Sequence, residues 1–245
     1  LSGGSPRVRV DVALAPALVP QGPREHLDVV VIDVLRATTT IVTAIASGAL
    51  GVRPEGSLAA AESAARAQGA LLGGEREGLP PPGFDLGNSP AAYTPERCRG
   101  RQVVLSTTNG TQAALAATGC RSLRAAALVN AEATCRALLA GGATDVLLLC
   151  SGTRTRVAAD DAAAAGCMAG SLLLMAAAEL TDGARLAVAL FDAWKHDLPG
   201  LLRRCESGQR LLAIDLASDI ADCARVDAVP VVVRLDGHGV FRREG

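Results

Sequence analysis

The sequence has few of the aromatic side chains with which proteins stack on nucleic-acid bases. Only five of its 245 residues are aromatic, and Lys195 is its one lysine, so every other basic side chain is an arginine. The 24 basic and 25 acidic residues leave a net charge of −1, and no block of like charges stands out. We therefore expect neither a nucleic acid nor an anionic membrane surface as a partner.

Cysteine pairs with the spacing of metal or redox sites are also missing. The seven cysteines are scattered without a Cys-x-x-Cys pair, which is typical of free, buried thiols in a reducing compartment. Residues Leu1–Gly4 lack the pattern of a signal peptide. The uncharged stretch Ala162–Ala178 is rich in alanine and glycine and shorter than a membrane span, so it predicts a buried helix. We expect a cytoplasmic protein without a membrane anchor.

What the sequence does contain is a repeated order of apolar strand, polar loop and alanine-rich helix. Strands are predicted over Val29–Asp33, Leu71–Gly73, Val103–Ser106, Asp145–Cys150, Arg185–Leu190 and Val229–Leu235, the last continuing into a hairpin through Asp236–Gly239. Helices are predicted over Ala37–Ser47, Leu58–Gln68, Thr111–Ala117 and Ala158–Leu180. This alternation indicates an α/β fold, a largely parallel sheet with helices on both faces in three layers. We expect one unit over residues 1–245, with two lobes that share one cleft as the alternative.

Asp33 stands at the end of the first buried strand, where a charge needs a partner or a metal ion. Arg36 follows three residues later, and the threonines Thr38–Thr40 mark the start of a helix. Two interpretations remain open: a catalytic, metal-binding aspartate, or an aspartate paired with Arg36 beside an ordinary threonine N-cap. Phosphatases that form an aspartyl phosphoenzyme usually carry a second aspartate two residues later. Leu35 occupies that position here, which disfavours their mechanism.

Two glycine-rich turns, Gly73–Arg76 and Gly83–Pro90, each carry a carboxylate. Hard oxygen ligands are what Mg²⁺ requires, so Asp33, Glu75 and Asp85 are the predicted metal ligands. The same turns hold candidate ligands for anionic oxygens: Arg76, Asn88 and Ser89. Ordinary turn chemistry also explains such residues, because Asp, Asn, Ser and Gly all favour turns.

The segment Ser106–Thr111 lies between a predicted strand and a predicted helix. Free N–H groups and the positive end of the helix point to one place there, which is typical of a phosphate site. Its candidate phosphate ligands are Ser106, Thr107, Thr108 and Asn109. The segment lacks the lysine and the spacing of a Walker loop, so we do not expect a nucleotide.

A rival phosphate site starts at Cys150. The segment from Cys150 to Arg156 has the Cys-x5-Arg spacing of cysteine phosphatases, in which a thiolate attacks phosphorus. The spacing is short enough to arise by chance in an arginine-rich chain. Asp160 and Asp161 follow at the start of the next helix, where they either favour the helix dipole or add a metal ligand or a base that orients water.

These segments, in this order, resemble the 2-phosphosulfolactate phosphatase family. The matching blocks are Val31–Thr40, Gly74–Arg76, Gly83–Pro90, Ser106–Thr111, Cys150–Gly152, Asp161 with Ala165-Gly166, Ser207-Gly208, Asp219-Ile220 and Val229-Pro230. The resemblance implies Mg²⁺-dependent hydrolysis of 2-phospho-3-sulfolactate to 3-sulfolactate and phosphate, a step of coenzyme M biosynthesis. The expected partner is therefore a small phosphorylated sulfonate, and we expect a homo-oligomer, a dimer.

The resemblance also implies residue roles. Asp33 and Arg36 are the expected catalytic residues, Asp161 orients the attacking water, and Ser151 joins the phosphate ligands. The sequence departs from the family pattern at Asp160, where a glutamate is expected, and in the additional cations Arg154 and Arg156. Two alternatives stay open. One is a cysteine-nucleophile phosphatase that uses Cys150 and Arg156, and the other is a non-catalytic binder of small anionic acids.

Overall fold

The computed structural model describes residues 8–108, 110, 113, 117, 119–154 and 156–245. The helix predicted over Thr111–Ala117 falls largely outside these residues, and Asn109 lies outside them. The described strands form one sheet in the order β4-β5-β3-β10-β9-β6-β2-β7-β1-β8. They are β1 (Arg9–Ala13), β2 (Asp28–Ile32), β3 (Gly51–Pro54), β4 (Leu71–Gly74), β5 (Gln102–Ser106), β6 (Ser122–Ala126), β7 (Asp145–Cys150), β8 (Glu179–Leu180), β9 (Val233–Leu235) and β10 (Phe241–Arg243).

The sheet consists of two parallel groups joined by an antiparallel hairpin. Strands β4, β5 and β3 form one group, and β6, β2, β7, β1 and β8 form the other. Between them the pairs β3–β10, β10–β9 and β9–β6 are all antiparallel. Three reversals of direction separate β3 from β6, so the two groups run in opposite directions. The predicted hairpin through Asp236–Gly239 is confirmed, although only Val233–Leu235 of the predicted strand Val229–Leu235 is strand.

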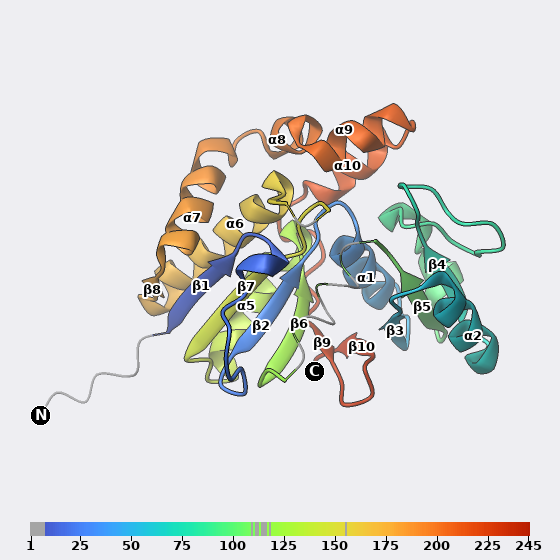
Figure 1. The fold of residues 1–245 in the computed structure, drawn as a ribbon, viewed down its shortest axis with the longest axis horizontal. Helices are drawn as coiled ribbons and strands as arrows, with labels where there is room; N and C mark the ends of the chain where they lie inside the picture. The colour runs from blue at the N-terminus through green and yellow to red at the C-terminus, as the bar shows by residue number, and fades with distance from the viewer. Residues whose placement is uncertain (1–7, 109, 111–112, 114–116, 118, 155) are drawn as a thin grey trace, which may run out of the picture.

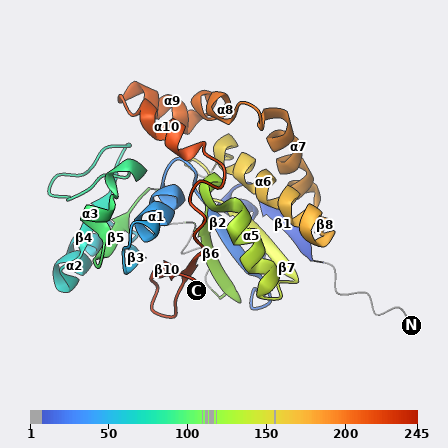
Figure 2. The same cartoon turned by 180° about the vertical axis from the view of Figure 1, so that it is seen from behind.

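The described helices complete the three-layer α/β fold (Figure 1). They are α1 (Ala37–Ala46), α2 (Leu58–Gln68), α3 (Pro95–Cys98), α5 (Ala131–Ala140), α6 (Ala159–Ala176), α7 (Asp182–Trp194), α8 (Leu198–Arg204), α9 (Glu206–Ala213) and α10 (Ala217–Cys223), with 3₁₀ turns η1 (Pro16–Leu18), η2 (Pro90–Ala92) and η3 (Leu128–Asn130). Seen from behind, α5 and α6 lie in front of β6, β2 and β7 (Figure 2). Helix α1 contacts β3, β6 and β10, so it fills the joint between the two groups.

The strand pleat explains why helices cover both faces of the smaller group. Leu71, Val103 and Leu105 belong to the main hydrophobic core, whereas their neighbours Leu72 and Val104 form a second cluster with alanines of α2. Successive side chains of a strand point to opposite faces. The face of Leu72 and Val104 is therefore covered by α2, and the opposite face packs on the main core.

The predicted strand over Arg185–Leu190 is wrong, because this segment lies inside helix α7. The hydroxyl of Thr181 caps the helix by accepting a hydrogen bond from the N–H of Ala184. Ala184 and Ala187 are buried, a spacing of three residues that places both on one helical face. A strand would have buried alternate residues instead.

Helix α6 is long and apolar enough, by length and composition alone, to cross a membrane. In this fold, however, 61% of its 18 residues are buried. It packs against α5, α7 and strands of the larger group. The prediction of a buried helix over Ala162–Ala178 is therefore confirmed in substance, since α6 contributes alanines and Leu172 to the main core. All seven cysteines are free, as predicted, and all but Cys120 are buried.

Candidate functional site

A cavity of about 700 Å³ opens where loops from both parallel groups meet. Its walls come from the segments after β2, β4, β5 and β7 and from helix α9. Strand ends of this kind are the usual ligand position in α/β sheets. The loops that line the cavity thus come from both parallel groups of strands. The segments after β2, β4 and β5 supply the lining residues Asp33, Leu35, Arg36, Glu75–Gly78, Asn88, Thr107 and Thr108. The loop after β7 and the α9 region supply Arg154, Ser207, Arg210, Leu211, Ala213 and Ile214.

Asp33 is buried at the carboxyl end of β2, with its side chain on the cavity wall. Its Oδ1 accepts a hydrogen bond from the N–H of Ala37, the first residue of α1, at 3.1 Å. Burial raises the pKa of Asp33, and the charge of Glu75 raises it further. The N–H of Ala37, the hydroxyl of Ser151 and the charge of Arg36 lower it. The protein groups around Asp33 therefore do not fully offset the cost of burying its negative charge.

Glu75 follows β4 and faces the same cavity. Its Oε1 accepts hydrogen bonds from the N–H and the hydroxyl of Thr108, at 2.8 and 2.9 Å, and its Oε2 accepts one from the N–H of Gly78 at 2.9 Å. These bonds hold the loops after β4 and β5 together. The N–H of Thr108, predicted to bind phosphate, therefore orients Glu75 in this structure.

Arg36 is buried, and it pairs with Asp219 rather than with Asp33. Its Nη1 donates to Asp219 Oδ2 at 2.6 Å, and its Nη2 donates to the carbonyl of Gly78 at 2.6 Å. Ser89 donates to the other oxygen of Asp219 at 2.5 Å. Arg36 therefore ties together the loops after β2 and β4 and helix α10. The interpretation of Arg36 as the direct partner of Asp33 is not supported.

The predicted threonine N-cap of α1 is absent, and the threonines bond backbone groups of neighbouring loops instead. The N-cap residue of α1 is Arg36, and it makes no side-chain capping bond. Thr38 accepts from the N–H of Asp33 and donates to its carbonyl, both at 2.9 Å. Thr40 donates to the carbonyl of Asn88. The threonine run therefore fixes the backbone around Asp33 and joins it to the loop that carries Asn88.

Arg76 lies at the cavity edge with its guanidinium on neutral acceptors. Its Nη1 donates to the carbonyls of Glu75 and Ser106, and its Nη2 donates to the hydroxyl of Ser106 at 3.1 Å. Within the described residues no carboxylate pairs with it. Arg76 therefore keeps a net positive charge beside Thr107, which also lines the cavity.

Asp161 and Ser151 lie beneath the cavity wall rather than on it. Asp161 Oδ1 accepts from the N–H of Val34 at 2.8 Å, and its Oδ2 accepts from the hydroxyl of Ser151 and the N–H of Gly152, both at 3.0 Å. Burial, with the charges of Asp160 and Asp33, raises the pKa of Asp161. Its bonds fix the loops after β2 and β7 relative to each other.

Asp160, the residue at which the sequence departs from the family pattern, is 2% exposed. Burial raises its pKa to about 6, and the charge of Asp33 adds to this effect. Its Oδ1 has no hydrogen-bond partner among the described residues. This buried carboxylate therefore has one oxygen that no described protein group satisfies.

The structure does not bring Asp85 to the other predicted metal ligands. Asp85 is exposed, and its Oδ2 accepts from the N–H of Leu72 at the start of β4. Ser89 and Ser106 also lie off the cavity wall, bonded to Asp219 and Arg76. Asn109 is outside the described residues.

Cys150 has no place in the cavity. It is fully buried, and burial raises the pKa of its thiol well above the usual value. Arg156 is exposed and pairs with Glu206, away from the lining residues. A cysteine nucleophile needs a depressed pKa and access to its substrate. The geometry therefore gives no support to the cysteine-phosphatase alternative.

The oxygen ligands on the cavity wall fit a magnesium ion that is completed by water and substrate. Among the described residues no three His, Cys, Asp or Glu side chains stand close enough to hold a metal ion by themselves. Mg²⁺, however, usually binds through one or two carboxylates together with waters and substrate phosphate. Asp33 and Glu75 would supply these carboxylates. Asn88 lines the cavity, is 3% exposed, and its Oδ1 has no hydrogen-bond partner in the described part of the chain.

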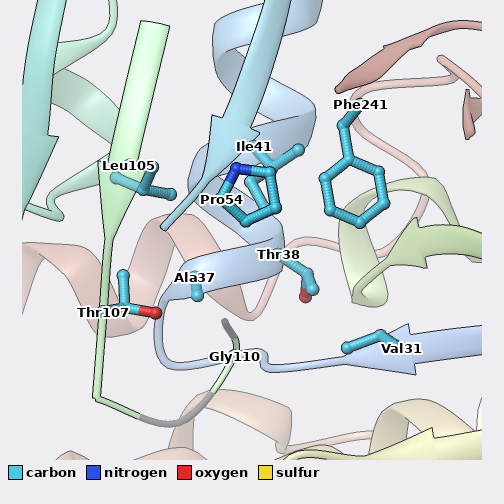
Figure 3. Close-up of a pocket in the computed structure, with 9 residues that line it drawn as sticks. All are labelled: Val31, Ala37, Thr38, Ile41, Pro54, Leu105, Thr107, Gly110 and Phe241. Carbon is cyan, nitrogen blue, oxygen red and sulfur yellow. The ribbon is translucent and has the colours of Figure 1, made fainter. Parts of the chain in front are cut away.

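A small, tightly packed seam lies beside Gly110, at the start of α1 (Figure 3). Its side chains come from both parallel groups and from the hairpin, including Val31, Leu105 and Phe241, and its free volume is about 10 Å³, near that of a single water probe. Gly110 closes this seam. A Cβ at Gly110 would lie 2.6 Å from Ala37 Cβ and 2.8 Å from Asp33 Oδ2. The position of the Asp33 carboxylate thus depends on the absence of a side chain at Gly110.

Sequence reasoning missed the wall formed by α9. Ser207 and Asp219 belong to blocks that carry the family resemblance, but neither received a role from the residues themselves. Arg210 gave no signal, because it is one of many arginines in the chain. Its place on the cavity wall follows only from the position of α9, which packs against α8 and α10 (Figure 1).

Comparison with known proteins gives a consistent result over most of the chain. The model of the family described as 2-phosphosulpholactate phosphatase matches residues 13–238. A Synechococcus sp. (strain JA-3-3Ab) protein is 42% identical over 221 residues, which cover 88% of this chain and 91% of the relative. A Gloeobacter violaceus protein is 38% identical over 237 residues, or 96% and 98% of the two chains. Both relatives carry the name "Probable 2-phosphosulfolactate phosphatase".

Proposed function

Because the chain belongs to the 2-phosphosulpholactate phosphatase family, we propose that it is a phosphoric monoester hydrolase that converts 2-phospho-3-sulfolactate to 3-sulfolactate and phosphate with Mg²⁺. The observation that carries the proposal is the pair Asp33 and Glu75 on one cavity wall, beside the positively charged Arg76. Coenzyme M biosynthesis is the pathway that this substrate implies, and it is part of the proposal.

Each group on this wall has a role in the proposal. Asp33, Glu75 and the free Oδ1 of Asn88 hold the metal ion and its waters, and Arg76 with Thr107 binds phosphate oxygens. When bound, Mg²⁺ would neutralise the charge that develops on the phosphoryl oxygens. Arg36 and Asp161 act as positioning residues, because the hydrogen bonds of Arg36 go to Asp219 and Gly78 and those of Asp161 to the loops after β2 and β7.

Phosphate release tests the proposal directly. We expect fast release from 2-phospho-3-sulfolactate with Mg²⁺ and at least a 100-fold slower rate after dialysis against EDTA, restored when Mg²⁺ is added back. Phosphoglycolate and 3-phosphoglycerate serve as comparison substrates. Release from these two substrates alone would support a phosphatase but contradict 2-phospho-3-sulfolactate as the substrate, and with it the coenzyme M pathway. A rate that EDTA does not change would contradict the proposed dependence on Mg²⁺. Binding of the substrate without release of phosphate would favour a non-catalytic binder.

Adding one methyl group at Gly110 is expected to lower kcat by about 10- to 100-fold. In Gly110→Ala the new Cβ must displace Ala37 or the Asp33 carboxylate, and the seam beside Gly110 has no room to take up the shift. Displacing a reacting group by about 1 Å commonly costs about 100-fold in rate. Steady-state phosphate release measures the effect.

Gly170→Ala is the matched control for this change. Gly170 lies within α6, and a Cβ there meets nothing within 4 Å. We expect a wild-type kcat and a gain of about 1 kcal/mol in unfolding free energy, because alanine favours the helix. A wild-type kcat in Gly110→Ala would show that the position of Asp33 does not limit turnover.

A further inference from the structure

The cavity has a second group of cations, on the wall formed by α9 and the loop after β7. Arg210 on α9 and Arg154 in the loop after β7 both line it, together with the hydroxyl of Ser207. No residue of this wall has a role in binding the phosphate or the metal. Arg154 is also one of the cations by which the sequence departs from the family pattern.

Arg210 is held in place by neutral groups. Its Nη2 donates to Ser207 Oγ at 3.3 Å and to Thr153 Oγ1 at 3.5 Å, and these two buried hydroxyls bond each other at 3.0 Å. In the described part of the chain no carboxylate pairs with Arg210. Its guanidinium is exposed at the cavity wall, oriented by these two hydroxyls, and can donate to an anionic ligand in the cavity.

A tight turn carries Arg154 on the same wall. Thr153 and Arg156 exchange backbone hydrogen bonds at 2.9 and 3.0 Å, and Gly152 packs so closely that a Cβ there would meet the carbonyl of Arg156 at 2.4 Å. Arg154 adopts a left-handed φ of +48° in this turn, a conformation that few residues with a side chain adopt. The turn thus holds the backbone of residue 154 at the cavity edge.

The other two arginines that line the cavity are engaged by other groups. Arg36 is neutralised by Asp219, and Arg76 bonds the loop after β5, beside the predicted phosphate ligands. The substrate of the proposed function carries a phosphate at one carbon and a sulfonate on the next. A sulfonate stays ionised and presents three acceptor oxygens, so it needs several N–H or O–H donors away from the phosphate. A cavity of about 700 Å³ has room for both groups.

We propose that Arg210, Ser207 and Arg154 form the subsite that binds the sulfonate of the substrate, with Arg210 as the residue that determines specificity for it. This inference rests on the proposed function. Arg210 donates to the sulfonate while Ser207 and Thr153 hold its guanidinium. The subsite selects the sulfonated substrate over the same phosphorylated acid with a methyl group in place of the sulfonate arm.

The test compares 2-phospho-3-sulfolactate with 2-phospholactate, which differ only in the sulfonate. In Arg210→Gln we expect KM for the sulfonated substrate to rise about 10- to 100-fold, the range for loss of a charge-assisted hydrogen bond. We expect kcat to stay within about threefold and KM for 2-phospholactate to stay unchanged. Arg156→Gln is the matched control, because Arg156 lies two residues from Arg154, is exposed and pairs with Glu206 outside the cavity.

Unchanged KM values in Arg210→Gln, or an equal rise for both substrates, would overturn the assignment. The second result would mean that Arg210 binds the phosphate or the carboxylate. If the wild-type protein releases phosphate from neither substrate, the proposed function fails, and calorimetry with 3-sulfolactate still tests the subsite. Binding at least tenfold weaker in Arg210→Gln than in wild type supports it. Equal binding, or no binding by the wild-type protein, overturns it.

Discussion

Asp33→Asn is expected to lower kcat at least 1,000-fold without loss of the fold. Asn keeps the Oδ1 that accepts from Ala37, but it removes the negative charge that the proposed metal ion requires. A 1,000-fold loss corresponds to about 4 kcal/mol of transition-state stabilisation. Phosphate release at saturating Mg²⁺ measures it, with circular dichroism to confirm the fold.

The expected change in stability has the opposite sign. Burial raises the pKa of Asp33, so its ionised form disfavours folding at pH values above the ordinary aspartate pKa. A neutral asparagine removes that cost. The melting temperature without added metal should therefore be unchanged or higher at pH 7. A marked drop in melting temperature would mean that the loss of rate reflects unfolding.

Asp85→Asn is the control that distinguishes Asp85 from Asp33 as a metal ligand. Asp85 is exposed, and the N–H of Leu72 donates a hydrogen bond to its carboxylate. The side-chain oxygen of asparagine can accept the same bond. We expect kcat and the Mg²⁺ concentration for half-maximal rate to stay within about threefold of wild type. A loss as large as that of Asp33→Asn would return Asp85 to the metal site.

Arg36→Met is expected to cost about 3–5 kcal/mol of unfolding free energy. Arg36 is 4% exposed and Asp219 is 1% exposed, so removing the guanidinium leaves a buried carboxylate without its cation. Breaking a buried ion pair on one side has costs of about this size. Methionine fills most of the space, so that the lost charge dominates. Urea unfolding followed by circular dichroism measures the change.

The double variant Arg36→Met/Asp219→Asn tests this explanation. Asparagine removes the stranded charge and still accepts from the hydroxyl of Ser89. We expect the double variant to recover at least about 2 kcal/mol of the lost stability. An additive loss in the double variant would show that packing, and not the charge of Asp219, explains the effect.

The parallel sheet could be predicted from the sequence because its central strands are apolar throughout. Strand β2 and strand β7 match their predicted ranges closely, since both are buried on both faces. Strand β6 was missed because Ser122 and Arg124 interrupt its apolar pattern. Both are buried nonetheless, in a network with Asp28 and Glu244 that no local pattern indicates.

The candidate site could be predicted where a charged residue directly follows a predicted strand. Asp33, Glu75 and Arg76 directly follow strands, which marked them as candidates, but their convergence depends on how the two oppositely directed groups pack together. Asp85 was grouped with them because a carboxylate in a glycine-rich turn looks the same in sequence whether it faces a cavity or caps a strand. Arg210 and Ser207 depend on where α9 packs, which is a long-range result that local spacing does not encode.

The two carboxylates of the proposed metal site belong to opposite sides of the joint made by β9 and β10. Asp33 follows a strand of the larger group and Glu75 a strand of the smaller one, whereas the joining strands span residues 233–243. During synthesis the ribosome delivers these joining residues after every described residue of the cavity. Both halves of the site are thus made early but locked together late, so the appearance of phosphatase activity on a translating chain would report completion of the whole fold rather than of either half.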